Sequence, residues 1–384
     1  MSIEASGDRE ERSESAPGAT AAVVADVPEE ARQTGGWSPR DLLRGDLGQL
    51  PVFIGLVIIT IYFQIAGSGF FLTAQNFNNF ALQIATPGIV AVAAVLVLLI
   101  GEIDLSLAAV AYVCGAVMAV LSARNGWAAP QAILAGLAAG AIIGFVNGFF
   151  VAVVRMPSFI VTVAGLIFYQ GVLLKLLEPQ QTLAVYDKTI VSLATSYLPT
   201  YLAIGLPALA LLLYVGGIFL TRFRRQRAGL LVQPTAQLAL QIGLPVVLTA
   251  GAIYAFDSYL GVPLMTMIMF GIITLFWLIT SKTAFGRHIY AVGGNAEASR
   301  RAGVRVVGLR IAIFTLASTL AAVGGILAVS RFAAAPTQID QFLLLNAIAA
   351  AVIGGVSLFG GRGSVWGVVL GALVVGSLFN GFAL

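Results

Sequence analysis

The chain consists largely of apolar runs, each about as long as the hydrocarbon core of a bilayer is thick. A helix needs roughly 20 apolar residues to cross a membrane, and the run from Ala132 to Val154 has about that length. Of the 384 residues, 59% are hydrophobic and only 10% are charged, whereas a soluble domain carries roughly 25% charged residues. The sequence therefore predicts an all-α, polytopic transmembrane helical bundle and excludes a soluble enzyme.

About eleven segments are apolar and long enough to be membrane spans. They lie near residues 50–66, 80–101, 104–122, 131–154, 158–177, 202–220, 233–255, 262–280, 307–329, 343–358 and 364–384. Only Glu102-Ile103-Asp104 separates the second from the third, so one of these two helices is expected to be broken or re-entrant. Residues 1–46 have no apolar periodicity and are rich in Glu, Ser, Ala and Gly, which predicts a disordered tail. Residues 47–384 would form the transmembrane domain.

Positive charge gathers in two loops and predicts the topology. Four Arg lie within residues 221–227, and residues 281–310 hold five Arg and Lys282 against the single acid Glu297. Loops rich in Lys and Arg stay on the cytoplasmic side. Alternation through the spans then places the N-terminus in the cytoplasm and residues 178–200 outside, as in a multi-pass protein of the plasma (inner) membrane. The net charge of +4 follows from this topology, and no nucleic-acid partner is expected.

Two segments resemble each other and indicate two weakly related halves. Gly140-Ala-Ile-Ile-Gly144-Phe-Val-Asn147-Gly148-Phe149 is similar to Gly371-Ala-Leu-Val-Val-Gly376-Ser-Leu-Phe-Asn380-Gly381-Phe382. Many transporters are built from such repeats, although chance similarity between Gly-rich apolar segments is the alternative. The first copy continues into a further span and the second does not, so a final helix is expected to be missing from the chain.

A glycine recurs at every fourth position of the span near residues 131–154. Gly136, Gly140, Gly144 and Gly148 share one helix face, and small residues at this spacing let a neighbouring helix approach closely. We interpret the pattern as a packing surface. Cys114, the single Cys, lies in an apolar stretch and is interpreted as a small core residue.

Several polar side chains interrupt the apolar spans and are candidates for a translocation pathway. Ionisable groups within a membrane are costly and are often functional. Two simpler interpretations remain open: Asp104 or Ser106 caps the following helix, and the amides and hydroxyls only bond between helices. The candidates are Asp104, Ser106, Asn147, Thr162 and Asn346.

The segment from Thr283 to Gly303 is long and polar, and it lies between two membrane spans. Gly293-Gly294-Asn295 predicts a turn, after which Asn295 can cap a short helix from Ala296 to Ala302. Acidic Glu297 would lie in the first turn of that helix and two Arg in its last turn, which matches the helix dipole. A capped helix in a cytoplasmic loop indicates a docking partner; the alternative is a lipid-facing amphipathic helix, although a broad apolar face is lacking.

Catalytic and cofactor motifs are not found. None of the three Lys stands in a phosphate-binding loop, and Gly361-Arg-Gly363 lacks the third Gly of a dinucleotide fingerprint, since Trp366 stands in its place. One His, His288, and one Cys provide no nucleophile–base pair. We therefore expect no catalytic residue, metal site or cofactor in this chain.

Four motifs, in this order, carry a family resemblance. They are Gly101-Glu-Ile-Asp104-Leu-Ser106, Pro157-Ser-Phe-Ile-Val-Thr162-Val-Ala-Gly, Phe285-Gly-Arg287-His-Ile-Tyr-Ala-Val-Gly-Gly294-Asn295-Ala-Glu297-Ala-Ser-Arg300 and Val352-Ile-Gly-Gly-Val-Ser-Leu-Phe-Gly-Gly361-Arg-Gly363. With them, residues 50–384 resemble the membrane permease subunit of ribose- and xylose-type ATP-binding-cassette sugar importers, most closely the xylose-type branch.

The resemblance implies a permease for a monosaccharide, xylose or a related pentose, that works as a homodimer in membrane lipid. Its implied partners are a separate ATP-binding subunit, which hydrolyses ATP, and a periplasmic or extracytoplasmic sugar-binding protein. The resemblance makes the polar segment a coupling helix that docks on the ATPase, through Gly286, Arg287, Gly294, Asn295, Glu297, Ala298, Arg300 and Gly303.

Two other classes of membrane protein fit the sequence less well. An ion-coupled secondary transporter would place several ionisable groups at mid-membrane, and Glu102 and Asp104 are the only close pair. An integral-membrane enzyme, such as a lipid-linked transferase, would need a metal or base cluster.

Overall fold

The structure, a computed structural model, describes residues 50–230, 232 and 235–384. The expected disordered tail, residues 1–46, lies outside the described residues, and so do the first two residues of the expected span near 233–255. The described chain is mostly α-helical. Its elements are α2 (Leu50–Ala66), α3 (Ala74–Leu99), α4 (Leu107–Ala123), α5 (Ala129–Ala152), α6 (Ser158–Leu177), β1 (Thr182–Ala184), α7 (Lys188–Thr195), α8 (Thr200–Arg227), α9 (Thr235–Asp257), α10 (Leu264–Lys282), α11 (Ala284–Gly294), α12 (Ala296–Arg301), α13 (Val306–Phe332), β2 (Ala334–Pro336), α14 (Gln341–Ile353) and α15 (Gly367–Ala383).

Each predicted apolar segment coincides with a helix, which confirms the helical bundle. Among the described residues, seven helices are long and apolar enough to cross a membrane, namely α3, α5, α6, α8, α9, α10 and α13. Helices α2, α4, α14 and α15 are apolar but shorter, at 10–17 residues. The expected total of eleven spans therefore stays a prediction. Helix α3 ends at Leu99 and α4 begins at Leu107, so the two spans are separate, continuous helices, and a broken or re-entrant helix here stays a prediction.

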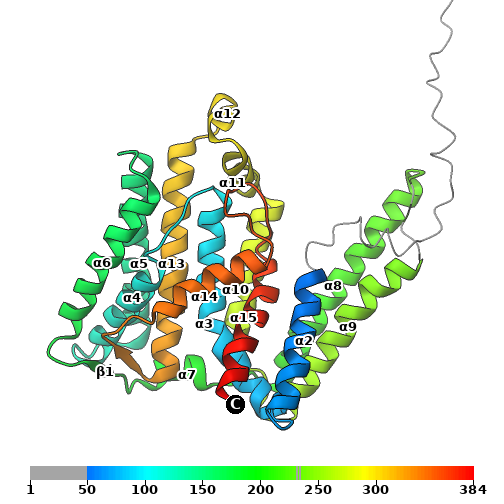
Figure 1. The fold of residues 1–384 in the computed structure, drawn as a ribbon, viewed down its shortest axis with the longest axis horizontal. Helices are drawn as coiled ribbons and strands as arrows, with labels where there is room; N and C mark the ends of the chain where they lie inside the picture. Colours follow the sequence, from blue (N-terminus) through cyan, green and yellow to red (C-terminus); the bar gives the residue numbers. More distant parts are fainter. Residues whose placement is uncertain (1–49, 231, 233–234) are drawn as a thin grey trace, which may run out of the picture. The chain divides into compact units, whose positions relative to one another are not determined.

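The core of the bundle is built around α3 and α13. Most side chains of α3 from Ile84 to Leu99 are buried, and α13 packs against α3, α4 and α5. Figure 1 shows α13 running between α5 and α3. By contrast, α8 and α9 bury few side chains, although they are strongly apolar. Because water does not solvate such surfaces favourably, their outer faces fit a lipid environment.

The glycine face of α5 packs as predicted. A Cβ on Gly144 would overlap the carbonyl of Phe314 in α13, and one on Gly140 would lie 2.8 Å from the Ser318 oxygen. Each glycine therefore permits a helix approach that any side chain would block. In α15, Gly371 lies in the same way against the backbone of Ala350 in α14. The glycines of the two similar segments thus serve helix packing in both places.

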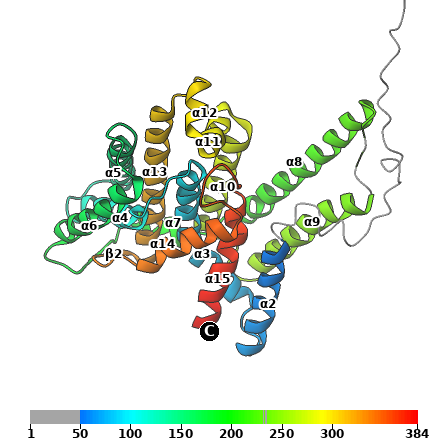
Figure 2. The same cartoon turned by 45° about the horizontal axis from the view of Figure 1, so that its top comes forward.

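Short extended pieces connect the helices at the end of the bundle opposite α12. β1 and β2 pair as antiparallel strands, with Leu183 opposite Ala335. Helix α7 lies in the same connection and buries Ile190 and Ala194. In Figures 1 and 2, β1 or β2 lies at one end of α13, and α12 lies at the other.

Candidate functional site

Helix α12 has the capped structure that the sequence predicted. The Asn295 side chain accepts a hydrogen bond from the Ala298 backbone N–H at 2.9 Å. Glu297 forms ion pairs with Arg300 (2.7 Å) and Arg301 (3.3 Å) on the surface. Gly303 ends the segment with φ +88°, a backbone conformation that favours glycine. The result is a short, pre-formed helix that projects from the end of the bundle (Figures 1 and 2).

The candidate coupling residues are nearly all accessible. Exposed side chains or backbone belong to Arg287, Gly294, Asn295, Glu297, Ala298, Arg300 and Gly303. Gly286 is buried instead, and a Cβ there would overlap the Thr280 carbonyl. Gly286 therefore sets the sharp connection between α10 and α11, while the others form a surface that another protein can reach.

The predicted turn at Gly293 and Gly294 was wrong in detail, because both residues are the end of helix α11. A side chain on Gly293 would overlap the Leu99 carbonyl at the end of α3. The glycine is needed for this close approach of two backbones. Helix α11 is anchored by buried Ile289 and Val292, so the base of α12 rests directly on the membrane-spanning bundle.

Three segments that are distant in sequence meet beneath α12. The Gly361 N–H donates to the Leu99 carbonyl at 2.9 Å, and the Tyr290 hydroxyl donates to the Gly363 carbonyl at 2.9 Å. Burial raises the pKa of Tyr290 above its usual value, so the hydroxyl keeps the proton that it donates. The end of α3, helix α11 and the loop between α14 and α15 are thereby held together.

The loop between α3 and α4 also carries an ion pair to α13. Arg310 Nη2 lies 3.0 Å from Glu102 Oε1, with 29% and 14% of the two side chains exposed. Arg310 belongs to the first turns of α13, shortly after α12. The sequence offered Glu102 only as a neighbour of Asp104, and its partner could not be identified from spacing.

Hydrogen bonds join three of the five candidate pathway residues, Asp104, Ser106 and Asn147, in the interior. The Tyr169 hydroxyl donates to Asn147 Oδ1 at 2.8 Å, Asn147 Nδ2 donates to Ser106 Oγ at 3.2 Å, and Ser106 Oγ donates to Asp104 Oδ1 at 2.6 Å. These four side chains are all at least nine-tenths buried, and we call them the buried polar network. Tyr169 was missed, although it lies on the same helix as Thr162, seven residues further on.

Asp104 organises the turn before α4. Its Oδ1 atom also accepts from the Ser106 backbone N–H at 2.8 Å. The Ser106 side chain makes no capping bond to α4, since its hydroxyl donates to Asp104 instead. Oδ2 of Asp104 is buried without a hydrogen-bond partner among the described residues. A buried carboxylate oxygen without such a partner is costly, and both the capping role and the pathway role of Asp104 stay open.

Thr162 and Asn346 have different surroundings. Thr162 is fully buried next to the network, and its hydroxyl donates to the Ser158 carbonyl of its own helix at 2.9 Å. Asn346 lies apart from the network, on α14. It lines a separate cavity of about 170 Å³. The polar residues around this cavity are Gln83, Thr86, Tyr112, Arg331, Asp340 and Asn346.

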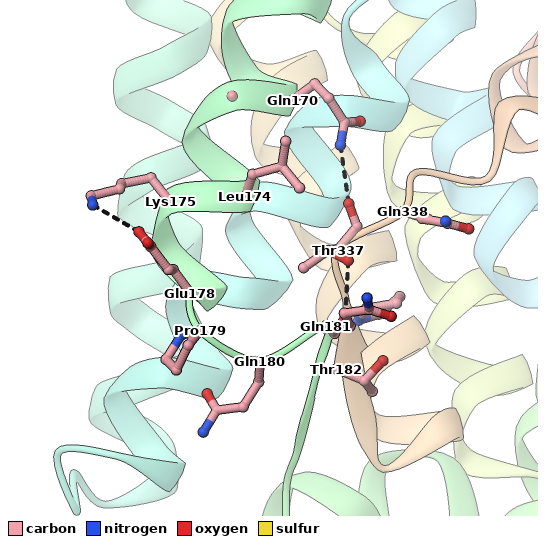
Figure 3. Close-up of a pocket in the computed structure, with 12 residues that line it drawn as sticks. Gln170, Leu174, Lys175, Glu178, Pro179, Gln180, Gln181, Thr182, Thr337 and Gln338 are labelled. Atoms are coloured by element: carbon pink, nitrogen blue, oxygen red, sulfur yellow. Dashed lines mark hydrogen bonds and ion pairs between the residues drawn. The ribbon is translucent and has the colours of Figure 1, made fainter.

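A larger hollow of about 800 Å³ opens at the end of α6 that lies farthest from α12. Figure 3 shows its amide and hydroxyl side chains, which come from α6, the segment after it and the segment after β2. Gln170 Nε2 donates to the Thr337 carbonyl at 3.0 Å, and Thr337 donates to the Gln181 carbonyl. Lys175 and Glu178 pair at 2.7 Å, so the lining has no net charge and many hydrogen-bonding groups.

No metal site is indicated within residues 50–230, 232 and 235–384, where no group of three or more His, Cys, Asp or Glu is positioned to hold an ion. Buried Cys114 is a free thiol in the core. The polar features that remain are therefore the network, the two hollows and the projecting helix.

Long apolar helices, an interior polar network and a projecting capped helix define the class of protein as a polytopic membrane permease. A family model described as the permease component of branched-chain amino acid transport systems matches residues 76–384. The chain belongs to this permease family, and within it to the group of ribose- and xylose-type importer permeases.

Individual relatives agree with this assignment. The chain is 35% identical over 338 residues to the xylose transport system permease protein of Escherichia coli K12, covering 87% of this chain and 86% of the relative. It is 31% identical to the fructose import permease protein of Rhizobium meliloti, over 86% of this chain and 77% of the relative. The ribose import permease protein of Bacillus subtilis is 30% identical, over 88% and 86%. No solved structure matches the chain significantly.

Proposed function

We propose that this chain is the membrane-spanning permease subunit of an ATP-binding-cassette importer for a monosaccharide, xylose or a related pentose. The sugar class comes from the similarity to xylose, fructose and ribose permeases, of which the xylose permease of Escherichia coli K12 is 35% identical. The working assembly would contain two copies of this chain, an ATP-binding subunit that hydrolyses ATP, and an extracytoplasmic sugar-binding protein. The chain itself would be no enzyme.

Helix α12 is the observation that carries the proposal. It is short, capped at both ends and exposed, and together with α11 it connects two long apolar helices, α10 and α13. Isolated helices of this length are unstable in water, so its caps and its firm base on α11 indicate a surface that is kept ready for a partner. An ATP-binding subunit that moves α12 would move α13, which packs through the centre of the bundle.

The interior groups suit a neutral, hydroxyl-rich solute. The hollow at the outer end of α6 presents amides and hydroxyls with no net charge, and amides and hydroxyls can each donate and accept. The buried polar network would then mark the route through the protein, with Asp104 as its fixed acceptor. A sugar needs such hydrogen-bonding partners and no counter-charge.

The orientation follows from charge. The end of α8 with Arg224, Arg225 and Arg227 and the α11–α12 segment would face the cytoplasm of the cell, by the preference of Arg-rich loops for that side. The hollow at the far end of α6 would face outward, toward the sugar-binding protein. The N-terminus would lie in the cytoplasm, and the chain would be a multi-pass protein of the plasma membrane.

Reconstitution tests this function. The purified chain in liposomes, with its ATP-binding subunit, the sugar-binding protein and ATP, should take up labelled xylose or a related pentose, and omission of ATP or of either partner should abolish uptake. Uptake by the chain alone, driven by a proton or sodium gradient, would contradict the proposal and favour an ion-coupled secondary transporter.

Two variants test the role of α12. Glu297→Arg places like charges beside Arg300 and Arg301, and Gly294→Trp adds bulk where nothing lies within 4 Å of a Cβ. Both should abolish uptake and co-purification of the ATP-binding subunit, while insertion stays normal. Gly243→Trp in α9, where the Cβ also has open space, is the matched control. Normal uptake by both α12 variants would contradict a docking role.

A further inference from the structure

The loop between α14 and α15 carries the most exposed large hydrophobic side chain of residues 50–230, 232 and 235–384. Phe359 is 91% exposed, and its neighbour Leu358 is 45% exposed. Arg362 in the same loop is exposed as well. An aromatic ring that is almost fully exposed to water is unfavourable, so the position of Phe359 indicates a binding partner.

The exposure of Phe359 is built into the backbone. The Ser357 N–H donates to the Arg362 carbonyl at 3.0 Å, and the Phe359 N–H donates to the Ser357 hydroxyl at 3.2 Å. Gly360 and Gly361 have φ values of 84° and 70°, a region that glycine adopts far more readily than other residues. The loop therefore presents the ring in one defined geometry, which lowers the entropic cost of binding.

The loop that carries Leu358 and Phe359 lies at the base of α12. Gly361 donates to the carbonyl of Leu99, and Tyr290 of α11 donates to Gly363. A Cβ on Gly360 would lie only 2.8 Å from the Gly293 oxygen, and Gly293 precedes the α12 cap by two residues. Figure 1 shows the loop after α14 running beside α11. The loop and α12 thus project from the same packed region, which is formed by the end of α3 and helix α11.

The surroundings of Phe359 differ from those of two other strongly exposed aromatic residues. Phe332 and Phe382 are 68% and 77% exposed, but they belong to the apolar helices α13 and α15. Phe359 belongs to a loop with a charged neighbour, Arg362, on the side where Arg300 and Arg301 are exposed. Aromatic residues and Arg are the types that most often anchor protein interfaces.

We propose that the Leu358–Phe359 tip is a second docking element for the ATP-binding subunit, with Phe359 as an aromatic anchor beside α12. The inference rests on the proposed function and extends it, since α12 alone was assigned as the contact. One subunit seated on both elements would hold α11, the end of α3 and the α14–α15 loop as a unit. Movement of the ATP-binding subunit would then reach α3 and α15 as well as α13.

Site-specific photo-crosslinking in the assembled importer tests this inference. A benzophenone amino acid at position 359 should crosslink to the ATP-binding subunit in native membranes, as should one at Arg301 on α12. The same group at Phe382 is the matched control and should give no such product. Crosslinks from position 359 to lipid alone, while position 301 reaches the ATP-binding subunit, would overturn the inference and leave the proposed function intact. Failure at both positions would overturn both.

Substitution gives an independent measurement. Phe359→Ala removes a ring that makes little contact with its own chain, so insertion and yield should stay unchanged. Affinity for the purified ATP-binding subunit should fall roughly tenfold or more, as for an anchor residue, and uptake should fall with it. Phe382→Ala provides the comparison. Unchanged affinity in Phe359→Ala would overturn the inference, whatever the effect of Glu297→Arg.

Discussion

Arg310 on α13 and Glu102 in the loop after α3 form an ion pair with 3.0 Å between Nη2 and Oε1. The pair links the segment after α12 to the segment before Asp104. Arg310 follows α12 by a few residues, and Glu102 precedes Asp104 of the buried polar network by two. If α12 docks on an ATP-binding subunit as proposed, we expect this contact to help transmit a displacement of α12 to Asp104.

Reversing the charge of either residue of this pair should lower both the thermal stability of the permease and its uptake of sugar. The side chains are 29% and 14% exposed, so loss of one partner should cost about 2 kcal/mol, below the ~3–5 kcal/mol of a fully buried pair. Glu102→Arg and Arg310→Glu should each lower both thermal stability and uptake, because each leaves like charges together. The exchanged double variant should recover part of both. A double variant no better than the singles would show that the ion pair has no role of its own.

The elements predicted best were those that a local pattern specifies. The apolar runs became helices because their composition leaves no other way to satisfy backbone groups in lipid. The four-residue glycine repeat of α5 packs against α13, as its spacing required. The cap at Asn295 and the opposite charges in α12 are also local signals, and the helix Ala296–Arg301 is present.

Helix α11 was missed because its glycines hid its periodicity. Phe285, Ile289 and Val292 are spaced as on one helix face, but Gly293-Gly294-Asn295 was interpreted as a turn instead. Gly286 permits a close contact with Thr280, and Gly293 permits one with Leu99. Their function depends on neighbours in space that the local sequence does not show.

Long-range polar pairs could not be predicted at all. Asn380 and Asn76 exchange side-chain hydrogen bonds of 2.8 and 3.1 Å between α15 and α3, although nothing in either segment points to the other. The candidate pathway residues show the same limit. Asp104 and Asn147 meet in one network, but Asn346 lines a different cavity. Residue type indicated an interior polar group and only the fold showed its partner.

Asp104 should tolerate an amide better than an apolar side chain. Its Oδ1 atom accepts from the Ser106 backbone and hydroxyl groups, and Asn retains such an oxygen. Asp104→Asn should therefore insert and remain stable, whereas Asp104→Ala leaves buried donors unpaired at a cost of about 1–3 kcal/mol. Thermal stability of the purified variants measures this difference.

Uptake by Asp104→Asn then separates the two roles of Asp104. A turn-forming role predicts nearly normal uptake, since the oxygen of Asn also accepts hydrogen bonds from nearby backbone groups. A strong loss of uptake in a stable, well-expressed Asp104→Asn protein would show instead that the charge at this position acts in transport.

Gly144 in α5 should not accept even one methyl group. A Cβ there would overlap the Phe314 carbonyl and lie 2.7 Å from the Thr315 Cα, so α13 would have to move. Overpacking of this kind costs about 1–3 kcal/mol. Gly144→Ala should lower the melting temperature of the purified protein, while Gly171→Ala in α6, where nothing lies within 4 Å, should not. Equal stability of the two variants would contradict the close packing of α5 on α13.

Arg124 should be needed to hold the C-terminal end of α6. Its Nη1 atom donates to the Leu176 carbonyl at 2.9 Å and its Nη2 atom to the Leu177 carbonyl at 2.6 Å, and it also bonds to the Gln180 side chain. The last carbonyls of a helix have no partner within the helix, and a cation near them is favourable. Arg124→Ala should therefore loosen the segment that lines the hollow in Figure 3.

Limited proteolysis of right-side-out membrane vesicles, in which the protease reaches only the outer surface, measures this loosening. Trypsin should cut Arg124→Ala after Lys175 faster than it cuts the unaltered protein there, by roughly the tenfold that about 1.4 kcal/mol of lost hydrogen bonding gives. Arg124→Lys should fall between the two, because it keeps the charge but cannot bond to both carbonyls as a planar guanidinium does. Lys188→Ala, an exposed position in the same connection, controls for the loss of one cation. If Lys188→Ala and Arg124→Ala were cut at the same rate, charge alone would explain the effect and the cap on α6 would carry no stability.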